Sequence, residues 1–288
     1  MSSFDYDNIK ENTSSKIKEI NDVIKRIKSY TPKVAIFGDS GVGKSSLCNA
    51  LFGKDVAKIS DVEACTREPQ EIFIGDKNSG GIHLIDVPGV GEDPKRHKEY
   101  TELYKSLLPS LDLIIWAIKA DDRKYATAMD VYETILKPNL ENCPVVFAIT
   151  QVEKIEPFGK WNDENNEPDE KQVINLDKKQ IDISERFDIS ISKIVPISSH
   201  KKYNLQMLVS RVVEVLPNEK KSSFTREAKE ENITEETYIK AEKGIFDYIK
   251  ERFDDVWDSV KGDVTDIIIE NAPKLIKKGL GWIKKMWF

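Results

Sequence analysis

The chain has few of the residues that hold metal clusters or secreted domains together. Its 288 residues include three cysteines and three histidines, and Cys48, Cys65 and Cys143 show no CxxC pairing. A zinc site is therefore not expected, and scattered cysteines indicate a reducing compartment.

Long apolar runs are scarce as well. A membrane-spanning helix needs roughly 18 to 20 apolar residues, and the best run, "LIIWAI" at residues 113–118, has the length of a strand. The first residues, "MSSFDYDNIKENTSS", are polar and mixed in charge, unlike a secretory signal peptide. We predict a cytoplasmic protein without a transmembrane anchor.

Positive charge is not in surplus. The net charge is −6, with 39% hydrophobic and 33% charged residues, as is typical of a globular domain with a sizeable core. Nucleic acid is consequently not an expected partner. The end of the chain differs, because residues 274–288 carry five lysines and no acidic residue.

Three regions follow one another along the chain. Residues 1–31 end in an amphipathic helix, where isoleucines recur three and four residues apart until Thr31-Pro32 ends it. Residues 32–217 alternate short apolar runs with helical patterns, which predicts an α/β fold with a mostly parallel central sheet covered on both faces. Residues 218–288 begin with a charged linker and continue with one or two amphipathic helices.

The second region predicts six strands and four helices. The strands are expected at 33–38, 71–75, 81–89, 112–118, 144–150 and 193–198. The helices are expected at 44–52, from a cap at Asp121-Asp122 through Leu136, at 172–187 and at 205–216. The acidic stretch at 161–170 predicts an exposed loop.

The stretch "GDSGVGKSS", residues 38–46, matches the pattern G-x-x-x-x-G-K-[ST] between a predicted strand and a predicted helix. Glycines allow successive main-chain N–H groups to turn inward around a polyphosphate, at the positive end of the following helix. Lys44 would reach the β- and γ-phosphates, and the Ser45 hydroxyl would ligate Mg²⁺. A glycine turn that binds nothing is the alternative. The expected phosphate-binding residues are Asp39, Ser40, Gly41, Val42, Gly43, Lys44, Ser45 and Ser46.

Two short motifs follow at spacings typical of a GTPase. "DVPG", residues 86–89, closes an apolar strand, so Asp86 can hold Mg²⁺ through a water and the Gly89 N–H can meet the γ-phosphate. "CTRE" places Thr66 about twenty residues after Ser45, where its hydroxyl can join Mg²⁺ when the γ-phosphate is present. Each motif alone is weak, but their order predicts a GTPase in which Lys44, Thr66 and Gly89 act in catalysis.

With these motifs, residues 33–217 resemble the Era-like branch of the translation-factor-related P-loop GTPases. "GDSGVGKSSLCNALFG" is similar to the family's first motif and helix, "CTRE" to its switch I threonine and "DVPG" to its switch II motif. The resemblance implies that Ser45 and Thr66 ligate Mg²⁺ and that Asp86 holds it through water.

The base-reading motifs depart from the family pattern. Where the family has [NT]-K-x-D after the fifth strand, this chain has Thr150, Gln151, Val152 and Glu153. A carboxylate there accepts two hydrogen bonds from guanine, and adenine lacks that pair of donors. Glu153 keeps the charge on a longer stem, whereas Gln151 keeps part of the aliphatic stem that covers the purine but loses the cation.

A later stretch, "ISSH", resembles the family's S-A-K and brings Ser198 and Ser199 to the base. These motifs predict GTP and GDP as ligands. Loose purine specificity with ATP, and a nucleotide-holding scaffold without turnover, are the alternatives.

Hydrolysis is expected to be slow. After "DVPG" the chain has Val90, which cannot orient a water, and the P-loop asparagine that holds potassium in some Era-like proteins is replaced by Gly41. Arg67, Arg96 and Arg123 are candidate arginine fingers, with solvated surface side chains as the alternative. We predict that a partner, or a nucleotide-dependent homodimer, raises the rate.

The last fifteen residues, "KLIKKGLGWIKKMWF", predict a cationic amphipathic helix. At 100° per residue the apolar side chains share one arc and the lysines the opposite arc, with only Phe288 outside. This pattern is typical of an interfacial membrane helix, in which each lysine near an anionic leaflet adds about 1 kcal/mol. Packing on the protein's own acidic surface, or on a partner protein, is the alternative. The lysines are Lys274, Lys277, Lys278, Lys284 and Lys285.

Helices on both sides of a GTPase domain are similar in layout to dynamin-like and immunity-related GTPases, in which a helical part contacts the membrane. Era-like proteins that bind the ribosome carry a KH module with a GxxG loop, and the sequence after residue 217 has none. The sequence therefore predicts a GTP-dependent switch that is cytoplasmic or peripheral to a membrane, and it gives no reason to expect RNA.

Overall fold

Six strands form one sheet in the order β2-β3-β1-β4-β5-β6. The computed structural model describes residues 3–53, 70–76, 80–87 and 97–270, and every structural statement below concerns these residues. Each neighbouring pair of strands is parallel except β2 and β3, which pair antiparallel. The strands are β1 (Lys33–Phe37), β2 (Gln70–Asp76), β3 (Gly80–Asp86), β4 (Leu113–Lys119), β5 (Val145–Thr150) and β6 (Ile194–Pro196).

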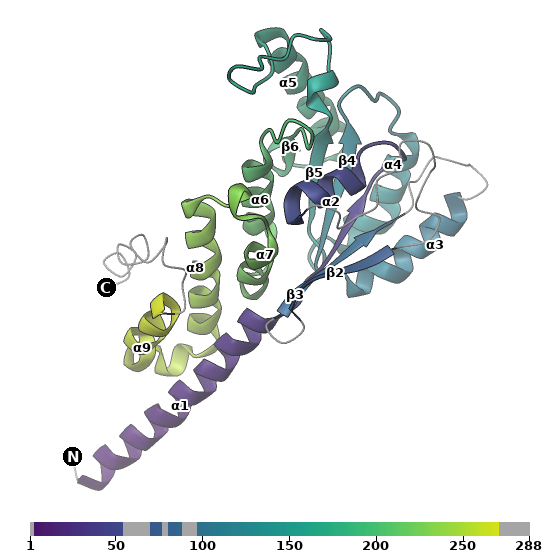
Figure 1. The fold of residues 1–288 in the computed structure, drawn as a ribbon. Helices are drawn as coiled ribbons and strands as arrows, with labels where there is room; N and C mark the ends of the chain where they lie inside the picture. Colours follow the sequence, from purple (N-terminus) through teal and green to yellow (C-terminus); the bar gives the residue numbers. More distant parts are fainter. Residues whose placement is uncertain (1–2, 54–69, 77–79, 88–96, 271–288) are drawn as a thin grey trace.

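Helices cover both faces of this sheet (Figure 1). The helices before and along the sheet are α1 (Ser3–Ser29), α2 (Lys44–Phe52), α3 (His97–Leu107), α4 (Ala126–Val131), α5 (Glu170–Phe187) and α6 (Leu205–Val215). After the sheet follow α7 (Lys221–Glu227), α8 (Glu235–Arg252) and α9 (Trp257–Glu270).

The apolar strands divide their side chains between two cores, as a sheet buried on both faces requires. In β1, Ala35 and Phe37 pack with α3, α4 and α5, and Phe37 stacks on Tyr104 of α3 with ring centroids 4.2 Å apart. Val34 and Ile36 pack on the other face with α2 and α6. The fold class predicted from the sequence is confirmed.

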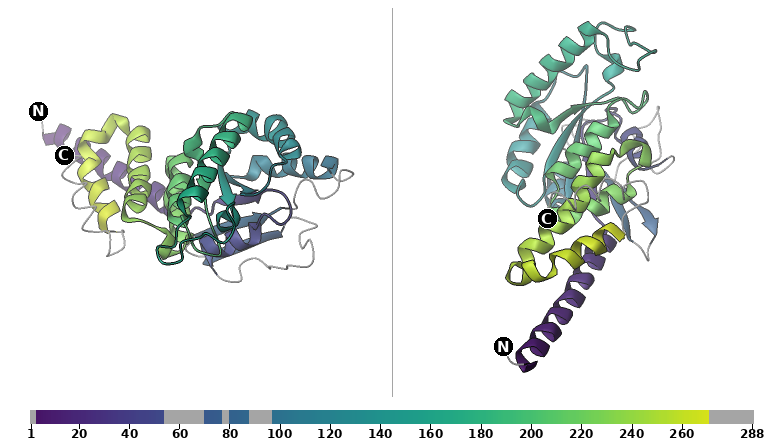
Figure 2. Two further views of the ribbon diagram at one scale, coloured as in Figure 1. Left: turned by 90° about the horizontal axis from the view of Figure 1, so that it is seen from above. Right: turned by 90° about the vertical axis from the view of Figure 1, so that its left-hand side faces the viewer.

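A third core joins the two ends of the described chain. The isoleucine stripe of α1 packs against α8 and α9, which lie side by side with it and away from the sheet (Figure 2). We name α1, α8 and α9 the helical unit. The fully buried side chains of this third core are Ile20, Ile245, Ile249 and Val260.

Three expectations about secondary structure were wrong. Helix α3 has a polar pattern and was not predicted. Helix α4 begins after Tyr125 rather than at a cap on Asp121-Asp122, because the Asp122 carboxylate accepts the Lys124 N–H at 2.9 Å within the preceding loop.

The third wrong expectation is the charged linker. Its residues fold into α7, flanked by two short 3-10 turns, η6 (Asn218–Lys220) and η7 (Glu230–Asn232). Phe224 of α7 is fully buried edge-on to Phe52, with ring centroids 5.7 Å apart. Uncharged residues in the middle of α7 reach the core, while the charged residues that suggested a linker lie at its ends.

Candidate nucleotide-binding site

The residues expected to bind nucleotide lie at the carboxyl ends of neighbouring parallel strands. The P-loop, residues 38–46, follows β1, Thr150 ends β5, and Ser198 follows β6. Asp86 is the last residue of β3 and is in register with Ile36 of β1, so its main chain lies at the same edge. Ligands of open α/β sheets bind at this edge.

Glycines give the P-loop its shape. Gly38, Gly41 and Gly43 have φ values of 142°, 73° and 90°, a region that side chains strongly disfavour. A Cβ on Gly38 would lie 2.3 Å from the Ala117 carbonyl oxygen, so the loop packs directly on β4. Gly43 then caps α2, which places the positive end of that helix beside the loop.

Lys44 lies within the loop that it belongs to. Its ammonium donates to the carbonyl oxygens of Gly38 at 3.1 Å and Asp39 at 3.0 Å, and the residue is only 9% exposed. Ser45 follows it in the first turn of α2 and is half-buried. The loop therefore presents a held cation and a neighbouring hydroxyl, which suit a phosphate and a hard cation.

The motif at residues 150–153, which we call the fourth motif, is hydrogen-bonded to the P-loop. The buried Thr150 hydroxyl donates to the Val42 carbonyl at 2.7 Å, and the Gln151 side-chain amide donates to the Gly41 carbonyl at 2.9 Å. These bonds bring together residues more than a hundred positions apart. The expected phosphate-binding motif and the segment expected to read the base therefore lie in direct contact.

Glu153 lies in a 3-10 turn, η4 (Val152–Lys154), directly after β5. Its Oε2 atom is enclosed and has no hydrogen-bond partner among the described residues. Leaving a buried polar atom unsatisfied costs about 1 to 3 kcal/mol. The two donors on the edge of guanine would satisfy this carboxylate.

Ser198 and Ser199 differ in what they can offer. The Ser198 N–H and carbonyl pair with Tyr203 at 3.2 and 2.9 Å, and its hydroxyl accepts the Lys201 N–H at 2.9 Å. Ser198 therefore holds the turn after β6 rather than presenting these groups to a base. Ser199 remains the candidate for contact with the base.

The Asp39 carboxyl was missed in the sequence, where only the Asp39 main chain was considered. Its Oδ1 atom is enclosed and has no hydrogen-bond partner among the described residues. Burial and the nearby Asp122 charge raise the pKa of Asp39 to about 6, and Lys44 opposes this shift. The folded protein thus favours the neutral form of the Asp39 carboxyl, next to the loop where phosphates are expected to bind.

A lysine of α5 holds the loop that contains Asp122 by hydrogen bonds. The Lys179 ammonium donates to the Asp122 carbonyl and to the Tyr125 hydroxyl, and burial lowers the pKa of Lys179. No pattern in the sequence distinguishes Lys179 from the other lysines of α5.

Several expected site residues lie outside the described residues. These are Thr66, Gly89, Val90, Arg67, Arg96 and the cationic segment 274–288, together with the side chain of Asp86. Arg123 lies exposed in the loop after β4. For Mg²⁺, the structure places the Ser45 hydroxyl at the edge of the sheet where β3 ends with Asp86, and a hydroxyl oxygen is a ligand that fits that ion.

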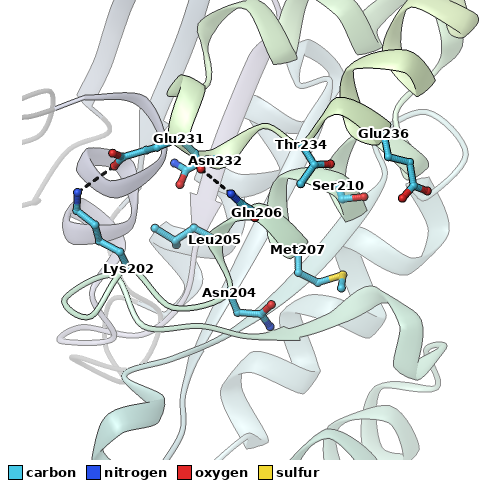
Figure 3. Close-up of a pocket in the computed structure, with 10 residues that line it drawn as sticks. All are labelled: Lys202, Asn204, Leu205, Gln206, Met207, Ser210, Glu231, Asn232, Thr234 and Glu236. Atoms are coloured by element: carbon cyan, nitrogen blue, oxygen red, sulfur yellow. Dashed lines mark hydrogen bonds and ion pairs between the residues drawn. The ribbon is translucent and has the colours of Figure 1, made fainter. Parts of the chain in front are cut away.

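A separate hollow of about 620 Å³ lies between α6 and the start of α8 (Figure 3). Lys202 and Glu231 form an ion pair at 3.1 Å, and Gln206 donates to the Glu231 carbonyl at 2.9 Å. None of the expected nucleotide-binding residues lines this hollow.

Comparison with known proteins agrees with this geometry. Residues 33–151 match the family described as 50S ribosome-binding GTPase. The chain is 37% identical over 198 residues to the uncharacterized protein YkfA of Escherichia coli (strain K12), covering 68% of this chain and 66% of YkfA. It is equally identical over 201 residues to YfjP of the same strain, covering 69% and 67%.

Another relative in this comparison is GTPase Era of Aquifex aeolicus (strain VF5). It is 31% identical over 187 residues, which cover 64% of this chain and 56% of Era. The fold and site define a P-loop GTPase domain. Residues 33–151 carry an Era-like P-loop GTPase domain.

The matched part spans about two thirds of YkfA and YfjP and little more than half of Era. Within the described residues, every helix is too short or too polar to cross a bilayer.

Proposed function

We propose that this protein binds GTP and GDP with Mg²⁺, hydrolyses GTP slowly and acts as a nucleotide-dependent switch. One observation carries the proposal. The base-reading segment is bonded to the P-loop through Thr150 and Gln151, and the Glu153 carboxylate there has an enclosed oxygen that lacks a donor.

Each residue has a defined part in this proposal. Main-chain N–H groups of residues 39–46 bind the phosphates, and Lys44 moves from its carbonyl partners toward the β- and γ-phosphates. Ser45 and Thr66 would ligate Mg²⁺ and Asp86 would hold it through water. Mg²⁺, when bound, neutralises charge that develops on the phosphate oxygens.

Slow turnover is expected from the two residues that would lie next to the γ-phosphate, Gly89 and Val90. The Gly89 N–H would contact it, but Val90 offers no hydrogen bond to an attacking water. Arg123, or another arginine in the switch segments, would then have to act across a homodimer or be supplied by a partner protein.

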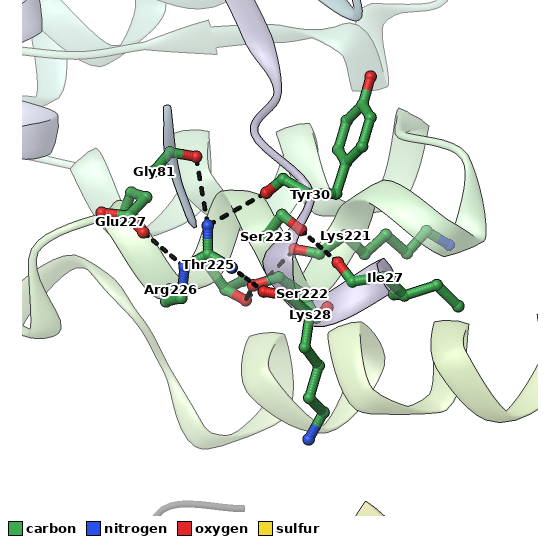
Figure 4. A network of polar contacts seen from close by, with 10 residues as sticks. All are labelled: Ile27, Lys28, Tyr30, Gly81, Lys221, Ser222, Ser223, Thr225, Arg226 and Glu227. Atoms are coloured by element: carbon green, nitrogen blue, oxygen red, sulfur yellow. Dashed lines mark hydrogen bonds and ion pairs between the residues drawn. The ribbon is translucent and has the colours of Figure 1, made fainter. Parts of the chain in front are cut away.

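A direct route from the site to the helical unit supports the switch role. Strand β3 leads into the "DVPG" segment, and Arg226 of α7 donates to the Gly81 carbonyl of β3 at 3.2 Å (Figure 4). The same guanidinium donates to the carbonyls of Lys28 and Tyr30 at the end of α1. A shift of β3 would therefore displace α1 and α7 together.

A second contact ties the residue after α1 and the turn η6 before α7 to the sheet. The buried carboxylate of Asp112, just before β4, accepts from Lys220 at 2.6 Å and from the Tyr30 hydroxyl at 2.9 Å. The helical unit would report nucleotide state to an anionic membrane surface through residues 274–288, or to a protein partner. We keep the expectation of a cytoplasmic or peripheral location without nucleic acid.

Nucleotide binding to three variants tests the proposed ligand. GDP, GTP and ATP should be titrated against the wild type, Glu153→Ala and Glu153→Asp in magnesium buffer. We expect the wild type and Glu153→Asp to prefer guanine nucleotides, because both retain the carboxylate that accepts from the base. Glu153→Ala should lose about tenfold or more in guanine affinity, as for a hydrogen bond to a charged group.

If Glu153→Ala leaves the purine preference unchanged, Glu153 does not read the base. If the wild type binds ATP as well as GTP, the protein is a nucleotide-binding protein with loose specificity.

Single-turnover phosphate release tests the reaction. We expect slow release that rises with protein concentration, because Val90, the residue after "DVPG", cannot orient a water. Fast release that is independent of concentration would refute this mechanism, and bound GTP that is never hydrolysed would make the protein a scaffold.

A further inference from the structure

We propose that Lys154 is a positioning residue of the nucleotide site and supplies the cation that the fourth motif has lost. The inference rests on the proposed function, because it concerns how a purine nucleotide is held. Where the family motif carries a lysine, this chain has Gln151, and Lys154 follows three residues later at the end of η4.

The contacts form a short chain that ends on the P-loop. The Lys154 ammonium donates to Gln151 Oε1 at 2.9 Å, and Gln151 Nε2 donates to the Gly41 carbonyl at 2.9 Å. A Cβ on Gly43 would lie 3.7 Å from the same Nε2 atom, so the amide lies close over the loop.

The backbone prepares this arrangement. Gln151 has φ 56° and ψ 39°, a left-handed conformation uncommon for a residue with a side chain. The turn that follows closes with the Lys154 N–H donating to the Gln151 carbonyl at 2.9 Å. This turn folds Lys154 back over Gln151.

Lys154 also determines which way the Gln151 amide faces. An ammonium group only donates hydrogen bonds and the Gly41 carbonyl only accepts them, so one orientation of the amide satisfies both. The ammonium polarises the amide and strengthens its bond to the P-loop. The stem of Gln151 is then held where the family's lysine stem covers the purine.

The alternative is a solvated surface lysine. Both hydrogen bonds are exposed to solvent, where water competes with them. We therefore expect Lys154 to contribute little to folding and to act when a bound purine covers the Gln151 stem. This difference separates a positioning role from a structural one.

The test is the rate of GDP dissociation from the wild type, Lys154→Met and Lys154→Arg. Lys160→Met is the matched control, because Lys160 is an exposed lysine in the following loop. We expect dissociation from Lys154→Met to be about 3- to 10-fold faster, as for the loss of one hydrogen bond. Lys154→Arg should restore most of the wild-type rate, Lys160→Met should match the wild type, and the melting temperatures without nucleotide should agree.

A second set of variants, made in a protein that also carries Gln151→Lys, tests whether Lys154 acts through Gln151. In Gln151→Lys, which restores the family residue, Lys154→Met should not accelerate dissociation further. Equal rates for the wild type and Lys154→Met, or the same acceleration in the Gln151→Lys background, would overturn this inference alone. A wild type that binds no GDP would overturn the proposed function, and this inference with it.

Discussion

Replacing Asp39 by Asn removes a buried negative charge from the P-loop while keeping the shape of the neutral acid. Burial and the Asp122 charge raise the pKa of Asp39 from 3.8 to about 6, so the folded protein favours the protonated form. The Asp39→Asn variant should therefore be more stable than the wild type wherever the wild-type carboxyl is ionised.

The size of the effect follows from the shift. Two pKa units correspond to roughly 3 kcal/mol at 1.36 kcal/mol per unit, and partial exposure of the side chain reduces this to roughly 1 to 2 kcal/mol. The folded-state pKa lies above the unfolded value. The stability of the wild type is therefore fully present below about pH 3.8 and falls, relative to Asp39→Asn, as the pH rises through about 6.

Urea unfolding of nucleotide-free protein measures this directly. We expect Asp39→Asn to gain roughly 1 to 2 kcal/mol over the wild type at about pH 7.5 and almost nothing at about pH 4. Asp255→Asn, at an exposed position beyond α8, is the control and should show no such trend. A difference between Asp39→Asn and the wild type that does not change with pH would refute the reasoning.

Two further predictions concern the helices. Arg226→Leu removes the donor that joins β3 to α1, so hydrogen exchange in β2, β3 and the end of α1 should become faster. The difference in exchange of α1 between the GDP-bound and GTP-bound states should also become smaller. Arg252→Leu, at an exposed arginine, is the control, and equal exchange in the two variants would contradict the coupling. Deleting residues 271–288 should abolish co-sedimentation with anionic vesicles at moderate salt, because the deletion removes the five lysines of a segment that has no acidic residue. Equal sedimentation of both proteins would remove the membrane proposal.

The sequence was sufficient wherever the signal is local. Short apolar runs and the turn between the second and third of them predicted all six strands, and the spacing of Gly38, Gly43 and Lys44 predicted a loop that the structure places between β1 and α2. The isoleucine stripe of α1 likewise predicted a buried face, and Ile20, Ile24 and Ile27 are buried.

The sequence failed where distant segments decide the structure. Helix α7 looked like a linker, but Ser223 donates to the Ile27 carbonyl, 196 residues away, at 2.8 Å. The raised pKa of Asp39 depends on Asp122, which only the fold brings near. The chain from Lys154 to the P-loop is visible once Gln151 is placed on Gly41, 110 residues earlier.

The most direct test is equilibrium binding of GDP and GTP, in magnesium buffer, to the wild type and to Lys44→Ala. Because the Lys44 ammonium lies at the centre of the P-loop, we expect the wild type to bind both nucleotides and Lys44→Ala to lose at least tenfold in affinity. A wild type with no affinity for either nucleotide, or a Lys44→Ala variant that binds them equally well, would contradict a phosphate site in this loop.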